Sequence, residues 1–72
     1  MVKELSIKEK YIRLDSALKL AGFVGTGGHA KTVVQSGEVK VNGEICLQRG
    51  KKLYKNDTAE YAGNTLFIKN AG

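Results

Sequence analysis

Apolar residues recur at helical spacing in the first half of the chain. One set has the i, i+3, i+4, i+7 spacing of a single helix face: Leu14, Ala17, Leu18 and Ala21. A second, shorter set follows: Ala30, Val33 and Val34. The pattern predicts two short helices, the first ended by Gly22 and the second capped by Thr26 and ended by Gly37.

Alternating apolar and polar positions predict strands on both sides of these helices. We expect strands at residues 2–7, 39–41, 44–47, 53–54, 58–62 and 65–69. The dipeptides Asn42-Gly43 and Gly63-Asn64 are typical of two-residue hairpin turns. Alternation predicts an inner face made of Val39, Val41, Ile45 and Leu47, and a core that also contains Tyr61, Leu66 and Ile68. Lys40 then points outward, and Cys46, in the opposite phase to its neighbours, is expected to be a half-buried filler.

Length and composition limit the kinds of site that the chain can build. At 72 residues, it is expected to form one domain, too small for a deep catalytic cleft. A single Cys and a single His are too few for an internal disulfide or a zinc site, and a lone thiol fits the reducing cytoplasm. The start of the chain lacks the apolar core of a signal peptide, and no apolar run reaches the length of a membrane span. We expect a cytoplasmic protein with a frayed end at residues 70–72.

The charge balance is basic. Twelve Lys and Arg residues against seven Asp and Glu residues leave a net charge of +5. Such a balance is typical of a small domain that binds a polyanion, either nucleic acid or an anionic surface. Lysine also keeps small proteins in solution, and charge alone leaves both interpretations open.

Catalytic patterns are weak. His29 stands without a recognisable nucleophile or orienting acid, and counting from Gly22 puts Gly28 and His29 where a Walker loop needs Lys and Ser or Thr. The loop from Gly25 to Gly28 opens the second predicted helix, so its N–H groups can seat a phosphate. Its glycines are equally consistent with a tight connector. We therefore expect no enzyme activity and no cofactor.

Several of these residues together resemble a known family. Arg13-Leu14-Asp15 followed by Leu18 is similar to the R-L-D-x-x-L opening of the RNA-binding domain named after small-subunit ribosomal protein S-four. Residues 30–43, AKTVVQSGEVKVNG, resemble its A-x-x-L-I-x-x-G-x-V-x-V-N-G segment, and residues 55–57 resemble its x-G-D turn with Asn56 in the glycine place. Thr26-Gly27 stands where the family usually has Ser-Arg. The resemblance covers residues 13–62.

The resemblance implies an α+β fold of the alpha-L type, with two short helices packed on a small, mostly antiparallel sheet of four to five strands. It implies one RNA-binding domain over residues 1–72, with its motif core at 13–62, in a short stand-alone bacterial protein. The expected partner is structured RNA, either ribosomal or transfer RNA, or a ribosomal particle, bound by a monomer in ribosome assembly or translation. The residues expected to contact RNA, gathered on one face beside the helices, are Arg13, Lys19, Thr26, Gly27, Gly28, His29, Lys31, Gln35, Lys40, Arg49, Lys51 and Lys52.

A second hypothesis is a small protein-interaction or carrier module of the β-grasp type, which has this size. A sulfur carrier of that type needs a C-terminal Gly-Gly, whereas this chain ends in Ala71-Gly72. Two predicted helices also precede most of the strands. A third hypothesis, an RNA-modifying enzyme, lacks an acid/base pair or a metal cluster in the sequence.

Overall fold

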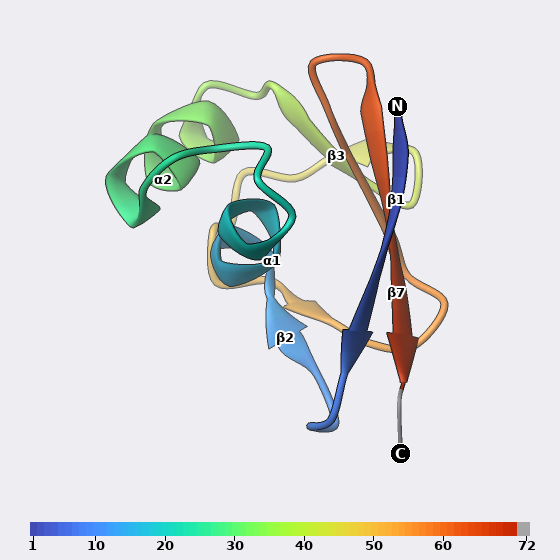
Figure 1. The fold of residues 1–72 in the computed structure, drawn as a ribbon. Coiled ribbons are helices and arrows are strands. Elements are labelled where there is room, and N and C mark those ends of the chain that lie inside the picture. The colour runs from blue at the N-terminus through green and yellow to red at the C-terminus, as the bar shows by residue number, and fades with distance from the viewer. Residues whose placement is uncertain (71–72) are drawn as a thin grey trace.

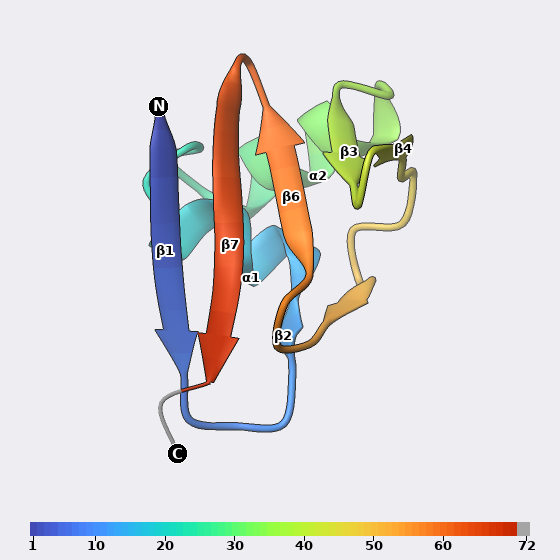
Figure 2. The same cartoon turned by 90° about the vertical axis from the view of Figure 1, so that its right-hand side faces the viewer.

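The computed structural model describes residues 1–70, which form two layers. Helices α1 (Leu14–Leu20) and α2 (Gly27–Gln35) cover one face of a five-stranded sheet, whose other face is open (Figures 1 and 2). The sheet has the order β1-β7-β6-β3-β4. Its strands are β1 (Val2–Ile7), β3 (Val39–Val41), β4 (Glu44–Ile45), β6 (Thr58–Tyr61) and β7 (Asn64–Asn70). Strands β2 (Ile12–Arg13) and β5 (Lys52–Leu53) form a separate antiparallel ribbon beneath α1.

The sheet is mostly antiparallel, as predicted. Strand β1 pairs in parallel with β7, and every other neighbouring pair in the sheet is antiparallel. A parallel pair needs a long crossover, and here everything from β2 to β6 lies between the two strands. This crossover carries both helices onto the same side of the sheet.

The first helix has the predicted buried stripe and the predicted end. Leu14, Ala17 and Leu18 are buried against the sheet. Gly22 follows the helix with φ +79°, a left-handed conformation that glycine adopts without a Cβ clash. The ammonium of Lys3 donates a hydrogen bond of 2.7 Å to the carbonyl of Ala21, so a cation lies at the negative end of the helix dipole.

The second helix also confirms its predicted cap and stripe. The Thr26 hydroxyl accepts a hydrogen bond of 3.0 Å from the backbone N–H of His29, one of the N–H groups that a helix leaves without an internal partner. Its apolar stripe is buried: Ala30, Val33 and Val34. Gly37 has φ +77° and ends the helix, as predicted.

The core fills the space between the helix layer and the sheet. Its largest fully buried side chains come from both layers and from the ribbon: Leu14, Leu18, Leu53, Leu66, Ile68, Val34 and Val39. Tyr61, also predicted for the core, is half-buried against it. Leu53 belongs to β5, so burial of its side chain attaches the ribbon to the same core.

The predicted inner face of the first hairpin was wrong in part. The turn at Asn42-Gly43 is confirmed, but Ile45 and Leu47 are 60% and 59% exposed, and Cys46 is the residue half-buried against the core. A two-residue turn places residue 45 opposite Lys40, so both side chains point to the open face. Residue 46 then lies opposite Val39 and faces inward. The strand is also shorter than predicted, since regular pairing ends at Ile45.

The second hairpin turns one residue earlier than predicted. Tyr61 pairs with Asn64, so Ala62 and Gly63 form the turn, both with positive φ. Asn70 was expected in a frayed end, but it belongs to β7 and pairs with Ile7. The other two residues of that expectation, Ala71 and Gly72, lie outside the described residues.

Candidate nucleic-acid interface

Four of the cations expected to contact RNA come together around the start of α1. Arg13 and Lys52 are partners in the β2·β5 ribbon. The segment between β4 and β5, which carries Arg49 and Lys51, passes behind α1 and returns to the ribbon (Figure 1). We call Arg13, Arg49, Lys51 and Lys52 the basic cluster.

Backbone hydrogen bonds fix the basic cluster in place. The first N–H groups of a helix have no partner inside it. In α1 the N-cap residue Arg13 makes no side-chain cap, and carbonyls of the neighbouring segment accept from the first two N–H groups. The N–H of Leu14 donates to the carbonyl of Lys51 at 2.8 Å, and the N–H of Asp15 donates to the carbonyl of Arg49 at 3.0 Å. The segment that carries Arg49 and Lys51, which we call the basic segment, is therefore anchored to the helix start by its backbone. The side chains of Arg49 and Lys51 stay exposed.

One carboxylate lies within the basic cluster. The guanidinium of Arg13 is 3.1 Å from the carboxylate of Asp15 in an exposed ion pair. The other oxygen of that carboxylate accepts from the N–H of Ser16 at 2.8 Å. Gly50 packs against the guanidinium, since a Cβ at this position would lie 3.6 Å from Nη2 of Arg13. The Arg13 side chain is thus held between the helix start and the loop.

A second group of predicted residues lies at the start of α2. Thr26 caps the helix, and Gly27 and Gly28 occupy its first two positions, where backbone N–H groups point out of the helix end. The backbone N–H of Gly25 donates to Nδ1 of His29 at 3.5 Å, so the imidazole folds back over the loop. The His29 ring also meets the Tyr61 ring edge-on at 6.5 Å between centroids.

The remaining predicted residues divide between the two layers. Lys31 and Gln35 are exposed and four residues apart on α2, so they share one helix face. Lys19 is exposed in the last turn of α1, at the far end of that helix from Arg13. Lys40 is exposed between the buried Val39 and Val41 and pairs with Glu60, so it lies on the open face of the sheet and the fold does not bring it to the helix side.

The sequence patterns did not indicate a role for Tyr11 and Tyr54, which lie beside the basic cluster. Their ring centroids are 5.9 Å apart, and Nζ of Lys52 lies 4.8 Å from the Tyr11 centroid. Both rings are partly exposed. The sequence does contain a signal for this arrangement. In residues 11–13 and 52–54 an apolar residue, Ile12 or Leu53, faces inward between polar or aromatic neighbours, which therefore face outward.

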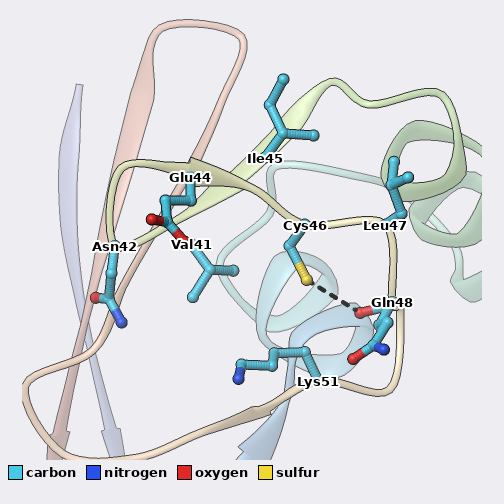
Figure 3. A pocket seen from close by; sticks show the side chains of 8 residues that line it. All are labelled: Val41, Asn42, Glu44, Ile45, Cys46, Leu47, Gln48 and Lys51. Atoms are coloured by element: carbon cyan, nitrogen blue, oxygen red, sulfur yellow. Dashed lines mark hydrogen bonds between the residues drawn. The ribbon is translucent and has the colours of Figure 1, made fainter.

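An open hollow of about 460 Å³ lies between the first hairpin and the basic segment (Figure 3). The thiol of Cys46 donates to the carbonyl of Gln48 at 3.6 Å inside it. Its charged lining residues are Glu44 and Lys51. Within residues 1–70, no group of three or more His, Cys, Asp or Glu side chains is placed to hold a metal ion. Neither helix of the described chain has the length and apolarity to cross a membrane.

Comparisons with known proteins agree on one family. The model of the S4 domain, the family whose motif the sequence resembles, matches residues 5–69. The chain is 41% identical over 63 residues to a probable ribosome maturation protein, RlbA, of Bacillus subtilis, covering 88% of this chain and 89% of that protein. It is 30% identical over 61 residues to a putative RNA-binding protein, YbcJ, of Escherichia coli, covering 85% and 87%. The solution structure of the Escherichia coli YbcJ, described as having an alfaL motif involved in RNA binding, superposes with a TM-score of 0.68 at 28% identity, over 94% of this chain and 85% of that one.

Proposed function

The chain belongs to the S4 domain family, and on that premise we propose that it is a non-catalytic protein that binds structured RNA. The observation that carries the proposal is the basic cluster: two backbone hydrogen bonds hold Arg49 and Lys51 at the start of α1, and ribbon pairing places Lys52 beside Arg13. These exposed cations can contact the phosphates of a nucleic acid. Phosphate contacts of this kind supply most of the affinity and little of the sequence preference.

The proposed binding surface extends from the basic cluster to the helix layer. It includes the cap and first positions of α2, where backbone N–H groups can donate hydrogen bonds to a phosphate, and the exposed side chains of both helices. Beyond the basic cluster, the residues of this surface are Lys19, Thr26, Gly27, Gly28, His29, Lys31 and Gln35. Lys40 is left out because it lies on the open face of the sheet.

The proposed partner is double-helical RNA in a folded molecule. The major groove of A-form RNA is too narrow for side chains, so a protein of this kind contacts phosphates and 2′-hydroxyls. The names of the relatives, a probable ribosome maturation protein and a putative RNA-binding protein, support an RNA target connected with the ribosome. We propose ribosomal RNA, with transfer RNA as the alternative. We place its action in the cytoplasm, as a monomer that acts on ribosomal particles. The match of the S4 domain model to residues 5–69 favours the RNA-binding proposal over the β-grasp alternative.

The test compares two double variants that remove the same charge from different faces. Arg49→Gln with Lys51→Gln removes two of the four cations of the basic cluster, and Lys40→Gln with Lys69→Gln removes two cations of the open sheet face. The probe is a labelled RNA hairpin with a long stem, and its dissociation constant is measured by fluorescence anisotropy at low salt. We expect the first variant to bind more than about tenfold more weakly and the second to change affinity less than about threefold.

Equal weakening by the two double variants would mean that net charge alone attracts the RNA, and would overturn the proposed surface. Absence of binding by the unmodified protein to any structured RNA, including ribosomal RNA, would overturn the function itself. A DNA hairpin of the same sequence checks that 2′-hydroxyls contribute, since the RNA hairpin is expected to bind more tightly. Circular dichroism melting confirms that both variants fold.

A further inference from the structure

The outer face of the β2·β5 ribbon combines two aromatic rings with two cations. Ile12 and Leu53 are partners in the ribbon and point toward the core. Because side chains alternate along a strand, the residues on either side of each partner point away from the core. These outward residues are Tyr11, Arg13, Lys52 and Tyr54.

The two rings form a tilted, partly exposed pair, which we call the Tyr11–Tyr54 platform. Tyr11 is 39% exposed and Tyr54 is 45% exposed. Their centroids are 5.9 Å apart with 51° between the ring planes, and the ammonium of Lys52 lies 4.8 Å from the Tyr11 centroid. Tyr54 is held by its own backbone, whose N–H donates to the carboxylate of Asp57 at 2.7 Å. The platform is therefore built on fixed backbone positions and not on a loose tail.

This combination suits one kind of RNA feature. Bases stack on exposed aromatic rings irrespective of their identity, and neighbouring cations hold the flanking phosphates. Within a duplex, both faces of every base are already stacked on neighbours, so only an unpaired base can offer a face to a protein. The ribbon is two residues long on each strand and carries one pair of rings, which is room for one base.

We propose that the Tyr11–Tyr54 platform seats a single unpaired nucleobase, from a bulge or a helix junction, while Arg13 and Lys52 hold the phosphates beside it. The inference rests on the proposed function, because the basic cluster must first bring a duplex to this end of the molecule. Such a site would let the protein bind an RNA with a bulge or a junction more tightly than a plain duplex. A structural role for the two tyrosines, as a cross-strand pair that only stabilises the ribbon, is the competing explanation.

The experiment uses two RNA hairpins that differ by one bulged nucleotide in the stem. We expect the unmodified protein to bind the bulged hairpin about 5- to 100-fold more tightly, the range that one stacked base supplies. Tyr11→Leu and Tyr54→Leu should each remove most of that preference and leave the affinity for the paired hairpin within about twofold. Tyr54→Phe keeps a ring and should keep the preference.

A second measurement uses the unmodified protein, in case a leucine variant fails to fold. The bulged base is replaced by the fluorescent base 2-aminopurine, and the chain contains no Trp whose emission would interfere. Saturating protein should change the emission of 2-aminopurine at the bulge and leave 2-aminopurine in the paired stem unchanged. An unchanged emission at the bulge, or a bulge preference that survives both leucine substitutions, would overturn the stacking site while the proposed function stands. Failure to bind either hairpin or any other structured RNA would instead overturn the proposed function.

Discussion

The side chain of Asn42 joins the tip of the first hairpin to the turn before β6. Its amide donates to the carboxylate of Asp57 at 3.2 Å, and its carbonyl oxygen accepts from the backbone N–H of Thr58 at 3.0 Å. Asn42 also has φ +52°, as the first residue of a two-residue turn requires. One residue thus shapes the turn and connects it to a segment distant in sequence.

Replacement of Asn42 by Gly keeps the turn but removes the side-chain hydrogen bonds of Asn42, including a third that its carbonyl oxygen accepts from the Thr58 hydroxyl at 3.4 Å. We expect Asn42→Gly to lower the free energy of unfolding by about 1–2 kcal/mol, since each such bond contributes about 1 kcal/mol. Asn42→Ala should be less stable still, because a Cβ in the left-handed region costs about 1 kcal/mol more. Urea unfolding followed by circular dichroism measures both. A glycine variant as stable as the unmodified protein would show that the hydrogen bonds add nothing.

A matched pair of leucines on α1 tests the helix-to-sheet core. Leu18 is fully buried, whereas Leu20, two residues away, is 67% exposed. Leu18→Ala should lower the free energy of unfolding by about 2–5 kcal/mol through the lost burial and the cavity. Leu20→Ala should change it by less than about 0.5 kcal/mol. Thermal melting separates the two, and similar melting temperatures would contradict the burial assigned to Leu18.

The cap of α2 makes a smaller contribution to stability. Thr26→Ala leaves the N–H of His29 without its 3.0 Å acceptor and should lower the free energy of unfolding by about 1 kcal/mol. Thr26→Ser retains a hydroxyl at the same position and should lie within about 0.5 kcal/mol of the unmodified protein. Denaturant titration of both variants checks the prediction. An alanine variant that matches the serine variant would argue against the cap.

Salt should weaken RNA binding steeply if the basic cluster contacts phosphates. Four bound phosphates of a duplex release enough counterions to give a slope of about −3.6 in a plot of log K against log salt concentration. Arg49→Gln with Lys51→Gln should reduce the steepness of that slope by between about 1 and 2. Anisotropy titrations at several salt concentrations give the slopes. A slope near zero for the unmodified protein would exclude phosphate contacts as the source of affinity.

Local sequence signals were sufficient for most of the fold. The apolar stripe that includes Leu14 and Leu18 predicted α1, Gly22 predicted its end, and Asn42-Gly43 predicted a hairpin turn. These signals are reliable because the spacing of buried residues in a helix and the backbone preferences of turn residues depend only on neighbours a few positions away. The error at Ile45 came from continuing the alternation of β3 through the turn without counting residues across it. A two-residue turn pairs residue 41 with residue 44, so the phase is reversed on the second strand.

The arrangement of the candidate site was decided by tertiary structure. The sequence by itself determined which residues are basic, where the helices begin and end, and that Lys40 points away from the core. Only the fold placed Arg49 and Lys51 against the start of α1, joined Tyr11 to Tyr54, and put Lys40 on the sheet face opposite the helices. A strand of two residues is too short to show an alternation of apolar and polar side chains in the sequence. The pairing of β2 with β5 therefore depends on the burial of Leu53 in a core shared by both layers.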